Sequence, residues 1–415
     1  MTHPTRSIEE LVDKLIDYRG KTPPKTSSGI RLVTAKVIKE GFIQDDRVEF
    51  IADDYYDTWM RRGLPRRNDI LMTTEAPLGE VAQIRTNERI ALAQRVILLR
   101  GNPKLINQNY FFQALKSPDV QARLRARSTG TTVLGIKQSE LRQVQIPCPP
   151  RPTQDRIANI LSAYDDLIEN NTRRIKILEE TAQRIYREWF VRFRFPGHEN
   201  VPLVPSDLGP IPQGWEPTTV GDLGEEKRRS VDPTEVAPET PYVGLEHIPR
   251  RSFALSEWST IDGIQSTKLR FKAGEILFGK IRPYFHKVVI APVDGVTSTD
   301  TIVISALRSE HRALLLNCVF SDDFVAQATQ TSQGTKMPRA NWGVLQKYPC
   351  SLPPRTLLSS FNAAVEPMVE LTTSLTLRSR NLRTTRDLLL PKLISGEISV
   401  EAAADVGAEL MEQTA

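Results

Sequence analysis

A heptad pattern between Pro152 and Phe195 constrains this chain of 415 residues more than any other feature of its sequence. Apolar residues recur there in alternating steps of four and three, which is the spacing of a helix that buries one seam against another helix. The seam consists of Ile157, Leu161, Tyr164, Ile168, Asn171, Ile175, Leu178, Ala182, Ile185 and Trp189. Such a helix, about 50 Å long at 1.5 Å per residue, needs an equally long partner.

The chain supplies this partner near its C-terminal end. Shifting the seam by 204 residues gives a second, weaker heptad pattern. Its positions are Phe361, Val365, Met368, Thr372, Leu375, Ser379, Leu382, Arg386, Leu389 and Leu393. We expect this second helix to begin near Leu357, to open or kink at Pro367, and to end by Pro391 or Gly396.

Polar residues interrupt both seams. If the two helices pack antiparallel, middle against middle, Asn171 comes to lie near Thr372 or Ser379. A buried polar residue at a seam position is a known way to fix the register of paired helices. A solvated gap in an imperfect seam is the alternative interpretation.

The repeat extends from the helices into the globular parts of the chain. Short matching strings recur at shifts of 206 or 204 residues. The matched pairs are Asp69–Leu71 with Glu275–Leu277, Pro77 with Pro283, Gly130–Thr131 with Gly334–Thr335, and Pro149–Arg151 with Pro353–Arg355. Shifts that agree this closely indicate two copies of one unit, each a globular domain followed by a long helix.

Strand-like runs and turn signals in each copy, with one helix expected near 109–127 and another near 314–330, predict an α+β fold. We therefore predict two similar globular α+β domains separated by two long helices, packed as an antiparallel coiled coil with a pseudo-twofold internal repeat. The predicted segments are a first domain at 1–150, a spacer helix at 151–195, a Pro-rich linker without regular structure at 196–214, a second domain at 215–354, a second spacer helix at 355–396 and a flexible tail at 397–415.

Composition bounds the function only loosely. A formal net charge of +5 permits a nucleic-acid partner but equally suits a solvated surface. Cys148, Cys318 and Cys350 form no CxxC motif, which favours a reducing compartment. The chain opens on a polar segment and contains no run of about 18 apolar residues. We therefore expect a cytoplasmic protein.

Motifs that would carry catalysis are missing from the sequence. There is no GxxxxGK[ST] nucleotide loop, no HExxH and no Asn/Asp-Pro-Pro-aromatic motif of the kind amino-methyltransferases use. The five histidines share no metal-ligand spacing. We therefore expect no catalytic residue, metal or cofactor in this chain. A rigid spacer between two similar domains instead suits an elongated ligand such as duplex DNA, whose half-sites recur on one face about every 34 Å.

Three segments, taken in order, carry a family resemblance. Residues 146–197 read IPCPPRPTQDRIANILSAYDDLIENNTRRIKILEETAQRIYREWFVRFRFPG, residues 207–224 read DLGPIPQGWEPTTVGDLG, and residues 386–398 read RDLLLPKLISGEI. They resemble the first conserved region, the start of the second recognition domain and the C-terminal signature of specificity subunits of type I restriction-modification enzymes. The match spans nearly the whole chain, but the polar seam positions of the second helix depart from a regular pattern.

The resemblance implies a non-catalytic subunit whose two target-recognition domains each contact one half of a bipartite, asymmetric site in double-stranded DNA. Its helices would set the spacer between the half-sites and dock two methyltransferase subunits, which bind S-adenosylmethionine and methylate adenine. Motor-nuclease subunits using ATP and Mg would complete the restriction complex.

Basic and polar side chains on loops are the expected DNA contacts. The candidates in the first domain are Arg61, Arg62, Arg66 and Arg67 around one turn, and Lys21 and Lys25 beside two prolines. The candidates in the second domain are Lys280, Arg282, Tyr284 and Lys287, which mix cations with an aromatic ring. The paired Gly-containing loops add Thr131, Thr335 and Lys336 as phosphate contacts. Solvated loop charge, a capped strand end and plain turns are the alternative interpretations.

A rival function from another class is a coiled-coil scaffold whose α+β domains bind protein partners. The spacing of the heptads fits that function equally well. A self-sufficient nuclease or methyltransferase is a third possibility, which the missing motifs make improbable.

Overall fold

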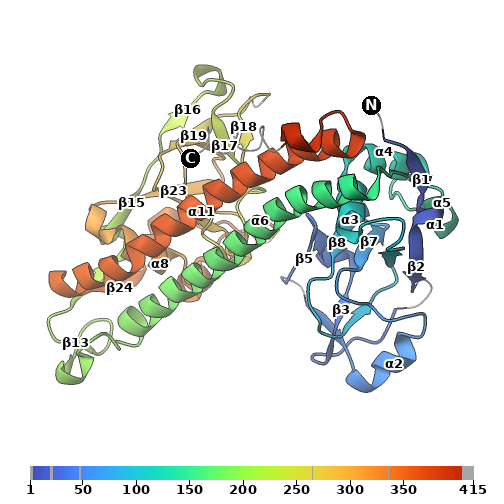
Figure 1. Ribbon diagram of the computed structural model, residues 1–415. Helices are drawn as coiled ribbons and strands as arrows, with labels where there is room; N and C mark the ends of the chain where they lie inside the picture. Colours follow the sequence, from blue (N-terminus) through green and yellow to red (C-terminus); the bar gives the residue numbers. More distant parts are fainter. Residues whose placement is uncertain (1–2, 19–21, 46–47, 264, 335, 404–415) are drawn as a thin grey trace. The chain divides into compact units, whose positions relative to one another are not determined.

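The computed structural model describes residues 3–18, 22–45, 48–263, 265–334 and 336–403 (Figure 1). The chain divides into two compact units. Unit 1 contains residues 1–166 and 382–415, and unit 2 contains residues 167–381. Each unit therefore holds one globular part and a portion of each long helix. The predicted boundaries that set the helices apart as separate segments stay a prediction.

A four-stranded antiparallel sheet forms the centre of unit 1. Its spatial order is β2 (Val12–Asp17), β10 (Val96–Gly101), β7 (Ile70–Thr74) and β8 (Leu78–Gln83). Successive side chains of a strand point to opposite faces. Ile70 and Met72 accordingly belong to one core with α3 (Gln108–Lys116) and α4 (Pro118–Ala126), while Leu71 belongs to another.

A second, three-stranded sheet lines the other core of unit 1. Its order is β6 (Glu49–Ile51), β3 (Ile30–Val33) and β9 (Ile90–Leu92). Leu32 and Ile90 from this sheet share a core with Leu71 and Leu98 from the central sheet. The central strands therefore read as continuous apolar runs because both of their faces are covered.

Unit 2 repeats this plan. Its central sheet has the order β15 (Gly224–Glu226), β23 (Thr301–Ala306), β20 (Ile276–Gly279) and β21 (Val288–Ile290). Its second sheet has the order β16 (Ser230–Val231), β19 (Lys268–Phe271), β22 (Gly295–Thr297), β17 (Pro241–Val243) and β18 (Ser259–Thr260). Ile276 and Phe278 face the core that contains α8 (Arg312–Val319) and α9 (Asp322–Gln330), while Leu277 faces the second sheet.

The globular part of each unit also begins with the same two features, a short strand paired with a later strand and a helical turn closed by a capping box. β1 (Thr5–Ser7) pairs with β11 (Gln145–Pro147), and β14 (Glu216–Thr219) pairs with β24 (Pro349–Leu352). Directly after these strands, Ser7 and Glu10 form the capping box of α1 (Ile8–Leu11), and Thr219 and Asp222 form that of α7 (Val220–Leu223). The matched sheets and caps confirm the α+β fold and the internal repeat.

Two long helices run through both units. α6 spans Arg151–Tyr186 and continues into a π-helical turn at Arg187–Val191, while α11 spans Arg355–Ser395. In unit 1 Asp165 of α6 bonds to Arg386 of α11. In unit 2 Phe190 packs against Phe361 with 4.8 Å between the ring centroids. Residue numbers rise along α6 as they fall along α11, so the helices run antiparallel, as predicted.

Both predicted domain helices are in fact pairs of shorter helices. The first pair, α3 and α4, breaks at Ser117, and the second pair, α8 and α9, breaks near Ser321. Pro118 stands in the first turn of α4, where its missing N–H costs nothing. The side chain of Ser321 caps α9 by accepting the N–H of Phe324. The expectation of single helices was therefore wrong.

The expected end of the second long helix at Gly396 is confirmed: α11 continues through Pro367 and Pro391 and ends directly before Gly396, whose φ is +79°. Two further expectations need correction. The Pro-rich segment 196–214, expected to lack regular structure, contains a short hairpin of β12 (Leu203–Val204) and β13 (Ile211–Pro212). In the expected flexible tail, residues 400–403 are helical and Ala403 is buried in the core of unit 1. Apolar residues thus anchor the start of the tail.

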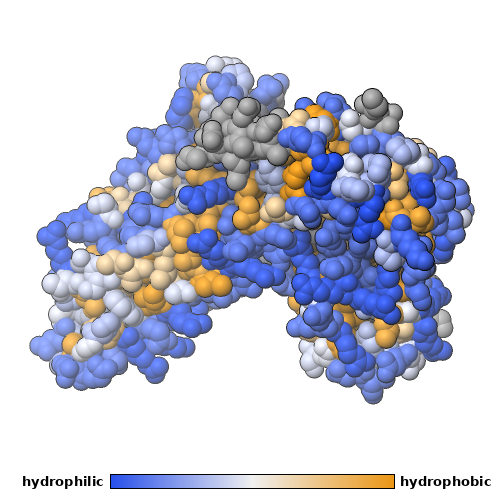
Figure 2. Space-filling model, in the orientation of Figure 1, coloured by the Kyte–Doolittle hydropathy of each residue, from blue (hydrophilic) through white to orange (hydrophobic). Residues whose placement is uncertain are grey.

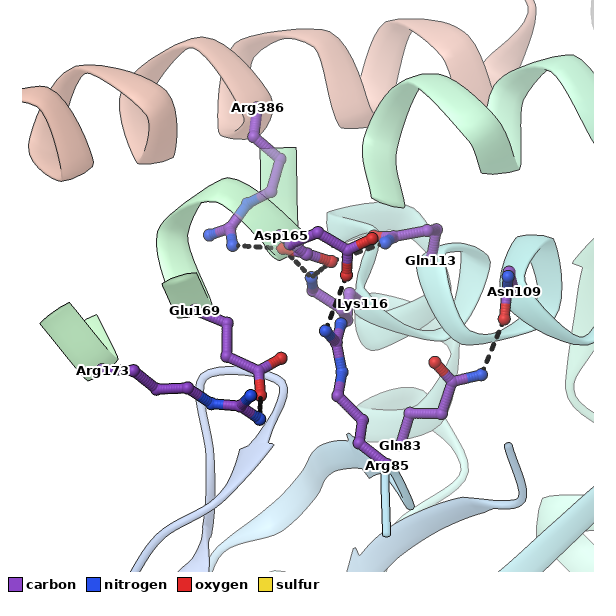
Figure 3. A network of polar contacts seen from close by, with 10 residues as sticks. Gln83, Arg85, Asn109, Gln113, Lys116, Asp165, Glu169, Arg173 and Arg386 are labelled. Atoms are coloured by element: carbon purple, nitrogen blue, oxygen red, sulfur yellow. Dashed lines mark hydrogen bonds and ion pairs between the residues drawn. The ribbon is translucent and has the colours of Figure 1, made fainter. Parts of the chain in front are cut away.

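A buried polar network joins both helices to α3 in unit 1 (Figure 3). The carboxylate of Asp165 accepts hydrogen bonds from Arg386 at 2.7 Å, Gln113 at 2.7 Å and Lys116 at 3.2 Å. Burial by itself would raise the pKa of Asp165, but the two cations outweigh it and lower that pKa. Burial lowers the pKa of Lys116 despite its partner. Arg386 at the seam is therefore stabilised by its ion pair with Asp165, so its charge does not disrupt the packing of the two helices.

We predict that Asp165→Ala lowers the free energy of unfolding by about 3–5 kcal/mol, because two buried cations lose their carboxylate. The midpoint of urea unfolding measures this loss. The matched control is Asp166→Ala, since Asp166 is 68% exposed and pairs with Arg85 at the surface. Its cost should stay below about 1 kcal/mol. Equal costs for the two variants would contradict the assignment of Asp165 as the centre of the network.

Candidate nucleic-acid interface

Each unit brings a turn and a hairpin loop together at one end of its central sheet. In unit 1 the turn is 75–77 and the loop is 129–137; in unit 2 they are 281–283 and 333–341, of which residue 335 lies outside the described residues. Glu75 bridges Gly135 in unit 1, as Ile281 bridges Arg339 in unit 2. We call each of these combinations a paired loop site.

The backbone of the two paired loop sites is the same. The N–H of Ile136 donates to the carbonyl of Thr74 at 3.0 Å, and the N–H of Ala340 donates to that of Lys280 at 3.0 Å. A reciprocal pair of backbone bonds closes each loop, joining Thr129 with Gly135 and Gln333 with Arg339. Gly130 and Gly334 both have positive φ, at +113° and +100°. The shift of 204 residues in the sequence thus corresponds to one loop structure used twice.

Three of the residues predicted in the second domain belong to the unit 2 site. Lys336 is exposed on its loop, Arg282 lies in its turn, and Lys280 joins the end of strand β20 to that turn. The N–H of Arg282 donates to the carbonyl of Pro338, which holds turn and loop together. Arg282 has a φ of +50°, a conformation that costs energy for a residue with a side chain. Thr335 lies outside the described residues.

Two of the predicted cations are engaged within the protein. The ammonium of Lys280 donates to the carbonyl of Thr299 at 3.0 Å and lies 3.8 Å from Glu226. The ammonium of Lys287 donates to the carbonyl of Leu245. Burial lowers the pKa of both lysines. Their geometry therefore supports a structural role, and their contact with DNA stays a prediction.

Aromatic rings and arginines alternate beside the unit 2 site. Tyr284 is 50% exposed and meets Phe285 edge to face at 4.8 Å. The guanidinium of Arg250 lies 3.9 Å from the Phe285 ring centroid, and that of Arg282 lies 6.0 Å from it. Such stacking holds guanidinium groups in place at the surface.

The unit 1 site contains an open pocket of about 350 Å³. Its lining is mostly polar and consists of Thr74, Glu75, Gln94, Arg95, Thr129, Gly135, Ile136 and Lys137. Thr131, the predicted residue, is exposed on the same loop. Sequence reasoning missed Gln94, Arg95 and Lys137, because their counterparts Asp300, Thr301 and Asn341 are not basic and gave no signal of a shared site.

The other residues predicted in the first domain lie elsewhere in unit 1. Arg61 donates to the carbonyl of Thr58, and Arg62 to that of Asp17. The exposed side chains of Arg66 and Arg67 make no hydrogen bond or ion pair with any residue described. Lys25 pairs with Glu49 at 2.8 Å. Lys21 lies outside the described residues. The structure thus offers Arg66 and Arg67 as the available cations of this group.

The predicted seam residues lie on the covered faces of the helices. Those that are buried include Ile157, Leu161, Ile168, Asn171, Phe361, Val365, Leu375, Leu382 and Leu389. Those that are half-buried are Tyr164, Ile175, Leu178, Ile185, Trp189 and Met368. The hydroxyls of Thr372 and Ser379 are buried in unit 2 without a hydrogen-bond partner among the residues described. Asn171 makes no side-chain hydrogen bond to either of them in the described structure, so its role in register stays a prediction.

A buried acid on α6 in unit 2 escaped the sequence analysis. One carboxylate oxygen of Glu179 accepts hydrogen bonds from the Ser252 hydroxyl at 2.7 Å and from the N–H groups of Phe253 at 2.9 Å and Ala254 at 3.1 Å. Burial raises the pKa of Glu179 to about 7, against the effect of these three donors. A pocket of about 500 Å³ opens beside it, and its lining includes Lys176, Arg184, Arg187 and Arg251.

The described part of the chain lacks two features that would point to other functions. No helix in that part of the chain is long and apolar enough to cross a bilayer. No group of three or more His, Cys, Asp or Glu side chains within it is placed to hold a metal ion.

Comparison with known proteins gives a consistent family assignment. Residues 5–180 match the family model described as the type I restriction modification DNA specificity domain. The chain is 27% identical over 344 residues to the type I restriction enzyme MjaIX specificity subunit of Methanocaldococcus jannaschii, covering 81% of this chain and 78% of the relative. It is 24% identical over 279 residues to the EcoDI specificity subunit of Escherichia coli, covering 62% of this chain and 58% of the relative.

A solved structure shares the fold. The S subunit of a type I restriction-modification system from M. genitalium superposes with a TM-score of 0.59 at 16% sequence identity. The alignment covers 94% of this chain and 96% of that structure. At this identity the likeness establishes the architecture of units and helices alone.

The raised pKa of Glu179 predicts how the stability of the protein depends on pH. The folded protein holds this proton more tightly than the unfolded chain, in which the pKa is near 4.5. The stabilisation is therefore complete below pH 4.5 and is lost as the pH rises to about 7, by up to about 1.4 kcal/mol per pH unit. We predict that Glu179→Gln removes this slope, as measured by urea unfolding between pH 4.5 and 8. Parallel curves for the variant and the wild type would contradict the assignment.

Proposed function

We propose that the chain is a specificity subunit of a type I restriction-modification enzyme and that it recognises a bipartite, asymmetric site in double-stranded DNA. Unit 1 reads one half of the site and unit 2 reads the other. The observation that carries this proposal is the repeated unit itself: the same sheet order and the same paired loop site occur twice, with different side chains. Two similar readers with different surfaces suit two different half-sites.

The long helices set the distance between the half-sites in this proposal. A continuous helix has a fixed rise of 1.5 Å per residue, so its length is a more constant measure than that of a flexible linker. The buried bonds of Asp165 to Arg386 and Lys116 support it, because they hold both helices to the globular part of unit 1. The lengths of α6 and α11 thereby determine how many base pairs lie unread between the half-sites.

The helices also offer docking surfaces for two methyltransferase subunits. Figure 2 shows apolar residues gathered along α11 on the face in view. Large apolar side chains are exposed on both helices, at Leu167, Ile177, Leu371 and Leu388. Exposed apolar side chains on a helix support contact with a protein partner. Motor-nuclease subunits complete the restriction complex.

The chain acts as a recognition subunit without a catalytic residue or a cofactor of its own. S-adenosylmethionine belongs to the methyltransferase subunits, and ATP and Mg belong to the motor-nuclease subunits. The complex works in the cytoplasm, where the host DNA is. The rival proposal of a protein-binding scaffold is not favoured, because the matching relatives are specificity subunits.

We predict that lengthening both helices lengthens the gap between the half-sites. One heptad inserted at matched positions of α6 and α11 adds about 10 Å, or about three base pairs. The experiment co-expresses this chain with its methyltransferase subunits and maps methylated adenines by single-molecule sequencing. The wild type should give one interrupted motif, and the variant the same two halves further apart. An uninterrupted wild-type motif would refute the proposed function, and altered half-sites would refute the division of labour.

We also predict that Arg66 and Arg67 contribute phosphate contacts in unit 1. If both contact phosphates, the double variant Arg66→Ala, Arg67→Ala should weaken DNA binding of the assembled complex equally for all sequences. The slope of log affinity against log salt should fall by nearly 2, since each contact adds about 0.9. The control is the double variant Lys14→Ala, Lys104→Ala, which removes two exposed cations elsewhere in unit 1. A slope unchanged from that of the control would remove this loop from the interface.

A further inference from the structure

The paired loop sites combine an identical backbone with unlike side chains. Counterpart positions hold Thr129 and Gln333, Glu75 and Ile281, Gly135 and Arg339, and Lys137 and Asn341. Each of these exchanges alters the hydrogen-bonding groups that the loop can present. A site that only closes the end of a sheet has no need for such variation. A site in which each copy reads a different sequence requires it.

At the paired loop site of each unit, an arginine and a carboxylate lie in loose contact. In unit 1 the Arg95 guanidinium lies 3.7 Å from the Glu75 carboxylate. In unit 2 the Arg339 guanidinium lies 3.5 Å from the Asp300 carboxylate. All four side chains are at least one-third exposed. At these distances the groups lie close to one another without a short hydrogen bond, so both remain able to bond to a ligand.

The two pairs arise from different positions of the shared backbone. Arg95 directly precedes strand β10 and its acid comes from the turn 75–77. In unit 2 the arginine comes from the loop and the acid precedes the strand. The same chemical pair has therefore been placed twice without a matching residue in the repeat. A shared ligand chemistry accounts for this recurrence.

An arginine beside a carboxylate complements a G·C base pair in the major groove. Guanine presents two acceptors there, N7 and O6, which arginine bonds in a bidentate manner. Cytosine presents its N4 amino group as a donor, which a carboxylate accepts. Arginine and carboxylate thus match the two edges of one base pair. A phosphate would be repelled by the carboxylate, so this arrangement suits base edges better than the DNA backbone.

Both loops also expose an apolar side chain at the same point of the hairpin. Val133 is 50% exposed in unit 1, and its counterpart Met337 is 53% exposed in unit 2. Apolar side chains contact the methyl group of thymine in the major groove. The matched exposure gives the hairpin loop of each unit one apolar group at its surface.

We infer that the paired loop sites are the base-reading elements of the two units, with Arg95 and Arg339 each bonding the guanine of a G·C pair. Glu75 and Asp300 accept from the paired cytosine. This inference rests on the proposed function and deepens it, because it names the residues that choose one base pair in each half-site. Neither arginine was among the candidates taken from the sequence.

The test uses the assembled methyltransferase complex and its methylated motif. Arg339→Ala should lose discrimination at one G·C pair of one half-site, by about tenfold to a hundredfold, and leave the other half and the gap unchanged. Arg95→Ala should do the same in the other half-site. The matched controls are Arg308→Ala and Arg89→Ala, since these exposed arginines have equally loose acidic partners at 3.8 and 3.5 Å. The controls should leave the motif unchanged.

A substitution that changes the preferred base separates reading from folding. Glutamine bonds adenine where arginine bonds guanine, so Arg339→Gln should shift the preference at that position from guanine to adenine. A misfolded variant cannot acquire a new preference. Suppose that the wild type methylates an interrupted motif and that the Arg339 and Arg95 variants methylate the same motif. That result overturns this inference and leaves the proposed function standing. Uniform loss of methylation without altered preference also overturns it, because that outcome indicates a phosphate contact. A wild type without an interrupted motif overturns the proposed function instead.

Discussion

The packing of the helices in unit 1 depends on the buried carboxylate of Asp165. Its burial is unfavourable unless charged partners surround it, and the chain supplies Arg386 from α11 and Lys116 from α3. An apolar seam alone tolerates slippage between helices by a turn, because one leucine resembles another. The buried ion pair does not, since any shifted register would leave a charge without its partner. Register, and with it the placement of unit 1 on the helices, follows from one electrostatic requirement.

A buried carboxylate with a similar role directly precedes one strand of each central sheet, β7 in unit 1 and β20 in unit 2. Asp69 accepts from the N–H of Arg66 and pairs with Arg100, and Glu275 accepts from the N–H of Lys272 and pairs with Arg229. The supporting chemistry is thus conserved between the two copies while the paired loop sites differ. A recognition protein gains from this division, because the surface can vary without loss of the frame that holds it.

Periodicity explains which features of this fold could be predicted from the sequence. The seams, the antiparallel helices and the repeat all follow from spacing and are found as expected. The breaks at Ser117 and Ser321 were missed because apolar periodicity continues across them, although Pro118 marked the first break. The partnership of Asp165 with Arg386 joins residues 221 positions apart, and the pockets beside Arg95 and Glu179 depend on several loops at once. Local patterns carry no information on such contacts.

Unit 1 is built from two segments at opposite ends of the chain, and this affects the order in which the units can fold during synthesis. Leu389, Leu393 and Ile394 belong to the same core as Ile157 and Leu161 of α6. Unit 2, by contrast, is one continuous stretch of residues. On a ribosome that adds residues from the N-terminus, the domain that emerges first is completed last. Until α11 has been synthesised, Asp165 lacks its partner Arg386 and the apolar face of α6 in unit 1 stays exposed to solvent. A chain truncated before α11 would therefore have an incomplete unit 1 as well as a missing C-terminal segment.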